Sequence, residues 1–362
     1  MSPNQQIRFC RSRDGTRIAY ATFGSGPPVV RACHVGTHLE LEWHSPVWKP
    51  LLLALGRSRQ LVRYDPRGCG LSDRDVQDHS LERQIEDLDA VIAACGVPRT
   101  AVAGVTGGGA VAVAYSAQYP ERVNRLLLLG SFVRGRIARS TTPAQAEECE
   151  TLLRLIEIGW DRGDPAFRQL YSSQFFPDGT ADEFASFNEL LRQSAPAANA
   201  ARFLRTMHAV DLTEFAPRVV CPTLVLHSRN DSRVPFDEGR ALAAMIPNAR
   251  FVPLESRNHL LLEREPAWAR LTSEIDGFLS APDDRHAAVA ERWFAELTRR
   301  ERQVLVLVAE GLDNATIGER LEISSKTVRN NVSVILSKLG VRTRSQAIVR
   351  AHQAGIGLHG PL

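Results

Sequence analysis

Cysteine is scarce in this sequence, and its spacing excludes the common thiol-based sites. Six cysteines occur in 362 residues: Cys10, Cys33, Cys69, Cys95, Cys149 and Cys221. None forms a Cys-x-x-Cys pair, and none stands with histidines at the spacing of zinc ligands. We therefore expect small buried thiols in a reducing compartment, and no metal or other cofactor.

Long apolar runs are missing as well. A membrane-spanning helix needs about 18–20 consecutive apolar residues, and the apolar stretch Ala101–Tyr115 is shorter and is broken by Gly107, Gly108 and Gly109. The first residues also lack the apolar run of a signal peptide. We expect a cytoplasmic protein without a membrane segment.

The net charge is only +3, but it is unevenly distributed. Arg292 and the residues after it include eleven Lys or Arg and six Asp or Glu, whereas the residues before Arg292 hold 33 basic and 35 acidic side chains. A basic tail on a slightly acidic body favours an anionic partner for the tail, although a solvated surface would give the same balance.

Length and composition indicate two folded parts. Hydrophobic residues make up 44% and charged residues 23% of the chain, which is ordinary globular usage, and a chain of this length suggests two domains. A proline and three charged residues follow Ala281 and mark a boundary. We predict a body over residues 1–280, a linker helix over 281–296 and a small domain over 297–362.

The small domain carries the signals of four consecutive helices. Thr298 and Glu301 form a capping-box pair that starts the first helix. The later boundaries are marked by residues that end or cap helices, namely Gly311, Asp313 or Asn314, Ser324, and Thr343 or Arg344. The third helix has an apolar face made of Val328, Val332, Ile335 and Leu339.

The second and third of these helices, joined by a tight turn, predict a helix-turn-helix that binds double-stranded DNA. The second helix of such a pair enters the major groove. On this geometry Arg329, Asn330 and Ser333 face the bases, since Arg can bond guanine and Asn can bond adenine. Phosphate contacts are expected from Ser325, Lys326, Thr327, Asn331, Lys338 and Arg344. The alternative is a helical bundle used for protein contacts.

This segment resembles the LuxR/GerE family of regulators. The matching motifs are Leu297-Thr298-x-Arg300-Glu301, Gly311-Leu312-x-Asn314, Ser324-x-x-Thr327-Val328 and Lys338-Leu339-Gly340-Val341. Asn331 stands where the family commonly has His, which we expect to alter a phosphate contact only. The resemblance implies transcription regulation by a homodimer that binds two half-sites.

The body alternates short apolar strands with amphipathic helices, which predicts an α/β fold with a mostly parallel sheet. The expected strands are Arg17–Phe23, Pro28–Cys33, Gln60–Tyr64, Thr100–Val105, Arg125–Leu129, Thr223–His227 and Arg250–Pro253. The expected helices include Ser80–Cys95, Gly108–Gln118 and Pro266–Leu279.

One strand-to-helix junction carries chemistry. Gly104-Val105-Thr106-Gly107-Gly108 matches the G-x-S-x-G nucleophile elbow, with Thr in the Ser position. Asp231 and His259 follow two later strands, in the chain order of a catalytic triad. Asp231 would orient His259, and His259 would take the proton from Thr106.

The body therefore resembles the α/β-hydrolase superfamily over residues 7–280. That resemblance implies a helical cap, at about residues 132–217, and an oxyanion hole formed by Gly107 with Val35 or Gly36. Two departures predict weak or absent catalysis. A β-branched residue is costly at the positive φ of an elbow, and the loop after the second strand lacks the His-Gly pair usual in hydrolases; a lost oxyanion donor costs about 10²–10³ in turnover.

The pocket can persist without the chemistry. Cap aromatics predict a largely apolar cavity for a small molecule, with ligand contacts expected from His38, Trp43, Trp160, Tyr171 and Phe175. We predict a one-component regulator that senses this ligand and binds operator DNA, with Thr106, Asp231 and His259 as a vestigial or ligand-contacting triad. The alternatives are an active hydrolase with Thr106 as nucleophile, and an interaction module with a collapsed pocket.

Overall fold

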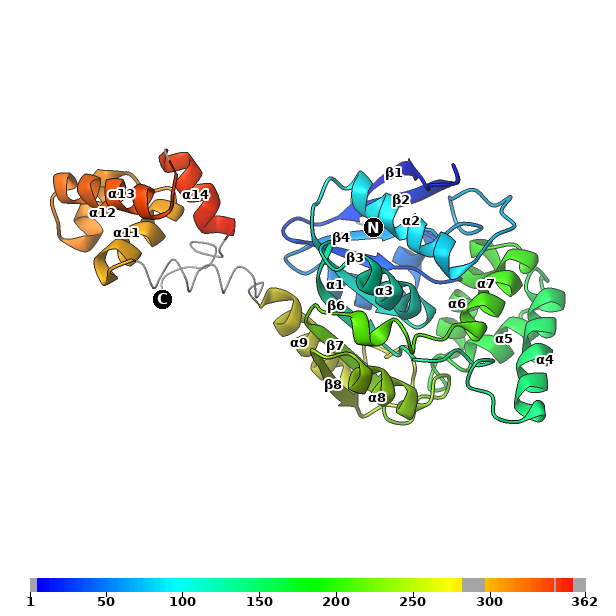
Figure 1. The fold of residues 1–362 in the computed structure, drawn as a ribbon. Helices are drawn as coiled ribbons and strands as arrows, with labels where there is room; N and C mark the ends of the chain where they lie inside the picture. Colours follow the sequence, from blue (N-terminus) through cyan, green and yellow to red (C-terminus); the bar gives the residue numbers. More distant parts are fainter. Residues whose placement is uncertain (1–4, 282–296, 342, 354–362) are drawn as a thin grey trace. The chain divides into compact units, whose positions relative to one another are not determined.

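The computed structural model describes residues 5–281, 297–341 and 343–353. The chain divides into two compact units, Met1–Leu279 and Ser280–Leu362, and each is described by itself. Element labels follow Figure 1. The predicted linker helix over 281–296 lies outside the described residues, Ala281 excepted.

The first unit is built on an eight-stranded sheet with the order β1-β2-β4-β3-β5-β6-β7-β8. Strand β2 runs antiparallel to both β1 and β4, and the other neighbours are parallel. The predicted mostly parallel α/β sheet is thus confirmed. The strands are β1 Gln6–Arg11, β2 Arg17–Phe23, β3 Pro28–Ala32, β4 Gln60–Tyr64, β5 Thr100–Val105, β6 Val123–Leu129, β7 Thr223–Ser228 and β8 Ala249–Leu254.

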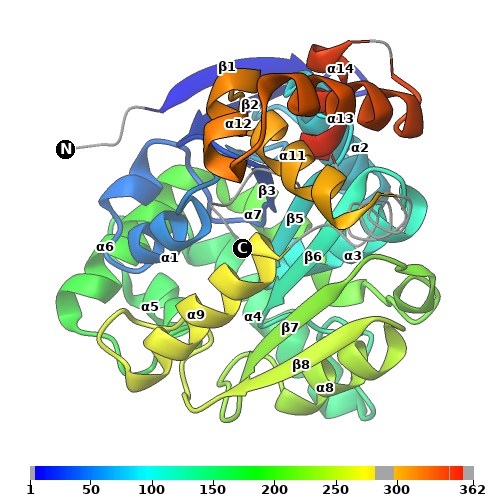
Figure 2. The ribbon, with the colours of Figure 1, turned by 90° about the vertical axis from the view of Figure 1, so that its left-hand side faces the viewer.

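Helices cover both faces of the sheet. Helices α1 and α9 lie on one face, and α2, α3 and α8 lie on the other (Figure 2). Strand β5 is buried along its whole length between these layers, as expected for an apolar strand of a parallel sheet. The bounds are α1 Trp48–Leu55, α2 Leu81–Ala94, α3 Gly107–Gln118, α8 Phe236–Met245 and α9 Pro266–Ser280.

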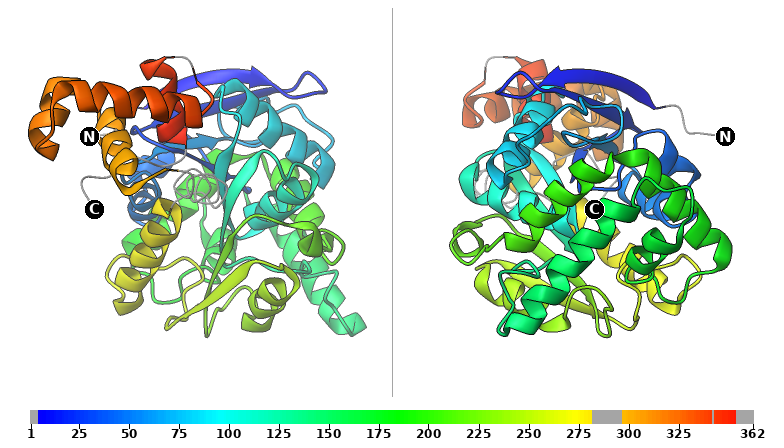
Figure 3. Two further views of the ribbon diagram at one scale, coloured as in Figure 1. Left: turned by 60° about the vertical axis from the view of Figure 1, so that its left-hand side comes forward. Right: turned by 90° about the vertical axis from the view of Figure 1, so that its right-hand side faces the viewer.

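Four helices between β6 and β7 form a separate layer, seen in green in the right-hand view of Figure 3. They are α4 Pro143–Gly159, α5 Ala166–Ser172, α6 Ala181–Ser194 and α7 Ala197–Ala209, all within the range predicted for the cap. Their inward aromatic side chains join the main hydrophobic core, which holds this layer against the sheet. The layer supplies one wall of the cavity described below.

A buried ion triad anchors the chain after β3. The Glu42 carboxylate lies 2.5 Å from the Arg31 guanidinium and 2.6 Å from that of Arg63, and all three side chains are almost fully buried. Trp48 and Trp43 cover the two guanidinium groups. Removing one partner of such a triad would leave a buried charge uncompensated. The three side chains therefore hold the chain around Glu42 firmly against strands β3 and β4.

The described residues of the second unit form four helices around a small apolar core. Thr298 and Glu301 form the predicted capping box at the start of α11, and the side chains of Asp313 and Ser324 cap α12 and α13. Val328, Ile335 and Leu339 are buried in this core. The helices are α11 Arg299–Ala309, α12 Asn314–Leu321, α13 Ser325–Lys338 and α14 Arg344–Gln353.

None of the helices in the described part of the chain combines the length and apolarity needed to cross a membrane.

Candidate functional site

Thr106 sits at a sharp turn between β5 and α3. Its φ is 52° and its ψ is −125°, a conformation that costs a branched residue free energy. Its N–H bonds the carbonyl of Leu129 on the neighbouring strand, at 3.0 Å. A Cβ at Gly108 would lie only 2.3 Å from the carbonyl oxygen of Ala32. The glycine therefore lets α3 pack directly on β3 and holds the turn in place.

Asp231 and His259 form a hydrogen-bonded pair. His259 Nδ1 donates to Asp231 Oδ2 at 2.7 Å, and neither side chain is exposed. The other carboxylate oxygen accepts the N–H groups of Arg233 and Val234, at 2.8 and 2.9 Å. Burial opposes ionisation of Asp231, but His259 and these hydrogen bonds hold the pKa of the carboxyl below its ordinary value. The arrangement fixes the ring of His259, as in a triad.

The loop that carries His259 is rigidly supported. Asn258 donates from Nδ2 to Glu265 at 2.8 Å, and its carbonyl oxygen accepts from the Ser228 hydroxyl at 2.6 Å. His227, which we did not predict as part of the site, lies 3.4 Å from Asp231. Burial lowers the pKa of His227, so it contacts Asp231 as a neutral ring. No sequence motif predicts this contact, because His227 reaches Asp231 only through its position near the end of strand β7.

The expected nucleophile and base are not joined by a hydrogen bond. Among the described residues, neither the Thr106 hydroxyl nor Nε2 of His259 has a hydrogen-bond partner. Gly107 and Val35 both line the cavity beside Thr106, whereas Gly36 does not. Its φ is +88°, and a Cβ there would meet Leu191 of the cap at 2.7 Å. The structure thus places Val35 beside the elbow, and Gly36 against the cap.

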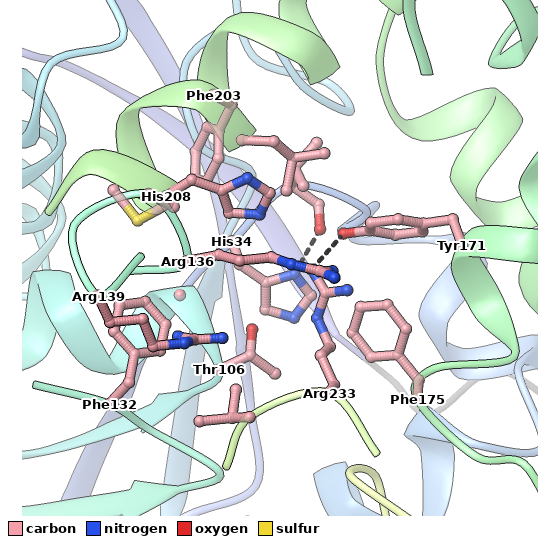
Figure 4. A pocket seen from close by; sticks show the side chains of 15 residues that line it. His34, Thr106, Phe132, Arg136, Arg139, Tyr171, Phe175, Phe203, His208 and Arg233 are labelled. Carbon is pink, nitrogen blue, oxygen red and sulfur yellow. Dashed lines mark hydrogen bonds between the residues drawn. The ribbon is translucent and has the colours of Figure 1, made fainter. Parts of the chain in front are cut away.

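A cavity of about 50 Å³ lies over the elbow, between the sheet and the cap (Figure 4). This is room for roughly three or four water molecules. Much of its wall is apolar, as expected. The lining residues are His34, Val35, Thr106, Gly107, Phe132, Arg136, Arg139, Tyr171, Phe175, Phe203, Leu204, Met207, His208, Arg233 and Val234.

Three arginines make the cavity less apolar than the sequence led us to expect. Arg136, Arg139 and Arg233 all line it, and the same three line an outer depression of about 540 Å³. Arg233 lies 4.2 Å from the ring centre of Phe175 and donates to the Tyr171 hydroxyl at 3.1 Å. The guanidinium groups therefore stand where the inner cavity meets the outer depression.

The aromatic and histidine residues predicted as ligand contacts divide into two groups. Tyr171 and Phe175 line the cavity. Trp160 is buried behind Tyr171, with ring centres 5.5 Å apart. Trp43 donates to Gln5 at 2.7 Å, and His38 accepts from the N–H of Glu40 at 3.3 Å. Trp160, Trp43 and His38 are thus not among the residues that line the cavity.

In the second unit, helix α13 presents one polar face to solvent. Ser325, Lys326, Thr327, Arg329, Asn330 and Ser333 are exposed on it. The Ser333 hydroxyl donates to the carbonyl of Arg329 at 3.1 Å, and Asn331 donates to that of Thr327 at 2.9 Å. No interaction is found for the side chains of Lys326, Arg329 and Asn330 within the described residues. If these three contact DNA as predicted, they need not first break a bond within the described residues.

Two other predicted DNA contacts are already engaged within the domain. Lys338 binds the Glu301 carboxylate at 2.7 and 3.0 Å, which joins the end of α13 to the start of α11. Arg344 donates to Asn314 at 2.9 Å and also to the carbonyl of Leu312. Both side chains therefore stabilise the domain, whatever they add in contact with phosphate.

Comparison with known families agrees with this geometry. A profile described as alpha/beta hydrolase fold matches residues 34–266, which is most of the chain. The chain belongs to the α/β-hydrolase family. A second profile, described as bacterial regulatory proteins, luxR family, matches residues 295–351. The protein thus joins an α/β-hydrolase domain to a LuxR-type DNA-binding domain, as both resemblances predicted.

The relatives of the chain include both hydrolases and a transcriptional regulator. The hydrolase domain is 25% identical over 244 residues to a putative carbamate hydrolase, RutD, from Azorhizobium caulinodans, covering 67% of this chain and 88% of the relative. The transcriptional regulatory protein LiaR of Bacillus subtilis is 32% identical over 137 residues, covering 38% of this chain and 62% of the relative. A solved hydrolase from Pseudomonas aeruginosa PA01 superposes with a TM-score of 0.64 at 23% identity, covering 76% of this chain and 99% of that chain. That likeness shows the fold.

Proposed function

We propose that this protein is a one-component transcription regulator, in which the hydrolase domain binds a small molecule and the LuxR-type domain binds operator DNA. One observation carries the proposal. The cavity over Thr106 is retained, although the position of the nucleophile is held by a branched residue. A pocket kept above an elbow that lacks Ser, in the same chain as a DNA-binding domain, is the arrangement of a sensor.

Regulation requires that the ligand bind two arrangements of the protein unequally. The cavity lies between the sheet and the cap, since its lining comes from the strand ends around Val35 and Thr106 and from cap helices α5 and α7. A ligand there contacts both layers. It would therefore favour one position of the cap over another, and we infer that this difference alters operator binding by the protein, acting as a homodimer.

A second candidate is an active hydrolase with Thr106 as nucleophile. The 2.7 Å bond between Asp231 and His259 favours it, because a base held in this way is ready to accept a proton. The names of relatives, which include a pyrrolizixenacetamide deacetylase from Xenorhabdus hominickii at 27% identity over 246 residues, point the same way.

Hydrolysis of p-nitrophenyl acetate separates the two candidates. We expect the wild type not to exceed the uncatalysed rate, Thr106→Ser to exceed it at least tenfold, and Thr106→Ser/His259→Ala to be silent again. Turnover by the wild type that is lost in His259→Ala would instead identify a working threonine hydrolase and overturn the sensor proposal. Selection of DNA from a randomised library by the full chain tests the other half, for which we expect one enriched sequence.

A further inference from the structure

We propose that the ligand is a small organic anion, with an apolar body in the inner cavity and a carboxylate held by Arg136, Arg139 and Arg233. This inference rests on the proposed function, because it names the chemical class of ligand for the same cavity. It rests on the charges at the cavity, on the partners of the arginines, and on the apolar wall.

The charge around the cavity is one-sided. Its lining, made entirely of described residues, includes three arginines and no aspartate or glutamate. Within the described residues, no carboxylate lies at ion-pair distance from Arg139 or Arg233, and Arg136 pairs only with Glu148 at 2.6 Å. Glu148 lines the outer depression and is largely exposed. Partly buried guanidinium groups without a counter-ion are costly, and an anionic ligand would supply one.

The pKa values of two neighbouring groups, His208 and Arg139, reflect the same excess of positive charge. Burial first, and then the charges of Arg233, Arg136 and Arg139, together lower the pKa of His208 to about 3. Burial likewise lowers the pKa of Arg139, with Arg136 and Arg233 adding to the effect against the opposing charge of Glu238. A carboxylate bound among these groups would reverse this repulsion.

Two histidines complete the polar part of the wall. Nδ1 of His208 lies 3.2 Å from the thiol of Cys149, which can donate to it and so leave the ring proton on Nε2 as a donor to the ligand. Nδ1 of His34 bonds the carbonyl of Val35, and its buried Nε2 has no partner among the described residues. Because Nδ1 donates, this Nε2 can only accept; such an atom is costly when left unsatisfied, and a hydroxyl or N–H group on the body of the ligand, not its carboxylate, would satisfy it.

The shape of the site places the two parts of the ligand. Phe132, Phe175, Phe203 and Met207 line the inner cavity, whose small volume admits a compact apolar group. The arginines border both this cavity and the outer depression. An arginine fork matches a carboxylate in two-point geometry. An aryl or short alkyl carboxylic acid satisfies both requirements, whereas inorganic phosphate satisfies only the second.

Calorimetric titration of the full chain with phenylacetate, phenylacetamide and inorganic phosphate tests the proposal. We expect phenylacetate to bind at least tenfold more tightly than the neutral amide and than phosphate. Arg233→Gln should weaken phenylacetate binding at least tenfold, and Arg233→Lys should weaken it less. The matched control is Arg154→Gln, on an exposed part of cap helix α4, which should leave binding unchanged.

Each contrary result overturns one part of the proposed ligand. Equal affinity for acid and amide, or no heat of binding for phenylacetate at 50 mM against sodium chloride of equal ionic strength, overturns the anionic ligand. Phosphate that binds as tightly as phenylacetate overturns the apolar body. If Arg233→Gln does not fold, Arg139→Gln provides the same comparison. The titration contains no DNA, so it tests ligand binding alone. If phenylacetate binds but leaves the affinity for operator DNA unchanged in a separate measurement, the regulatory proposal is overturned and this inference stands.

Discussion

Residue 106 combines a branched side chain with a positive φ of 52°. Strain of this kind costs about 1–3 kcal/mol and persists only where the surrounding packing dictates it. Here Gly108 and the hydrogen bond to Leu129 fix the turn. The elbow geometry is thus a property of the scaffold, and it is retained with threonine in place of serine.

Arg329 and Lys326 have different expected roles in DNA binding. Arg329→Ala should cost about 1–3 kcal/mol at one base position, because a base-reading contact is lost. Lys326→Ala should weaken binding to all sequences alike and lower the slope of log K against log salt by about 1. Fluorescence anisotropy with the selected DNA and its single-base variants measures both effects. Sequence-independent losses for both variants would contradict the base-reading role of Arg329.

Lys338 is not a clean probe of phosphate contact. Its ion pair with Glu301 means that Lys338→Ala also removes a bond between α11 and α13. The uniform loss of affinity expected from a lost phosphate contact would therefore be mixed with a loss of stability.

His208 should make the hydrolase domain sensitive to acid. Burial lowers its pKa from 6.5 to about 3 in the folded chain. Between these two values the unfolded chain binds the proton and the folded chain does not, so stability is complete above pH 6.5 and falls as the pH drops towards 3. His208→Gln should reduce the fall in Tm between pH 7 and pH 4.5. The exposed His44→Gln is the matched control, and equal falls in all three proteins would contradict the assignment.

At the scale of helices, Glu301 joins two elements of the DNA-binding domain. It accepts the N–H of Thr298 in the capping box of α11 and binds Lys338 at the end of α13. Glu301→Ala should destabilise α11 by about 1–2 kcal/mol, which is the usual cost of a lost cap. Hydrogen exchange of the α11 amides in the full chain measures this local loss.

Two further variants separate the cap from the ion pair. Glu301→Gln keeps a hydrogen-bond acceptor for the cap and should cost less than Glu301→Ala. Glu310→Ala removes an exposed pair with Arg320, which should be worth about 0–1 kcal/mol. Protection that falls equally in Glu301→Ala and Glu310→Ala would show that the capping box adds nothing here.

The elements that sequence predicted well are those with a strong pattern. Strands β2, β4 and β5 match their predicted bounds because apolar runs with clear ends define them. Strand β1 was missed because it is an edge strand with little burial, so its sequence shows no apolar face. Helix α1 was also missed; its Pro50 reads as a helix breaker, yet it lies in the first turn, where proline is tolerated.

At the scale of the whole molecule, sequence indicated the two domains and predicted a triad, of which Asp231 and His259 are hydrogen-bonded, but it did not indicate the character of the pocket. Motifs identify Thr106, Asp231 and His259 because their spacing follows strand ends. Arg136 and Arg139 precede the first cap helix, and Arg233 follows β7. No local pattern links residues so far apart, since only the packing of the cap on the sheet brings them to one cavity.

The two domains also differ in what salt does to them. Contacts between the basic second domain and DNA release counter-ions, and so weaken as salt rises. The arginines at the cavity are partly buried, where screening is weaker. Raising the ionic strength should therefore weaken DNA binding more than ligand binding. At high salt, ligand binding can then be measured without DNA binding.

The position of the three arginines also affects how quickly a bound molecule could leave the inner cavity. The three side chains border both the inner cavity and the outer depression, so a molecule that moves from one space into the other passes beside them. On this route, its rate of escape would depend on how often the guanidinium groups part. If the protein is the ligand-binding regulator proposed above, it would keep its ligand after the surroundings have been depleted of it, and transcription would follow the recent history of supply more closely than its momentary level.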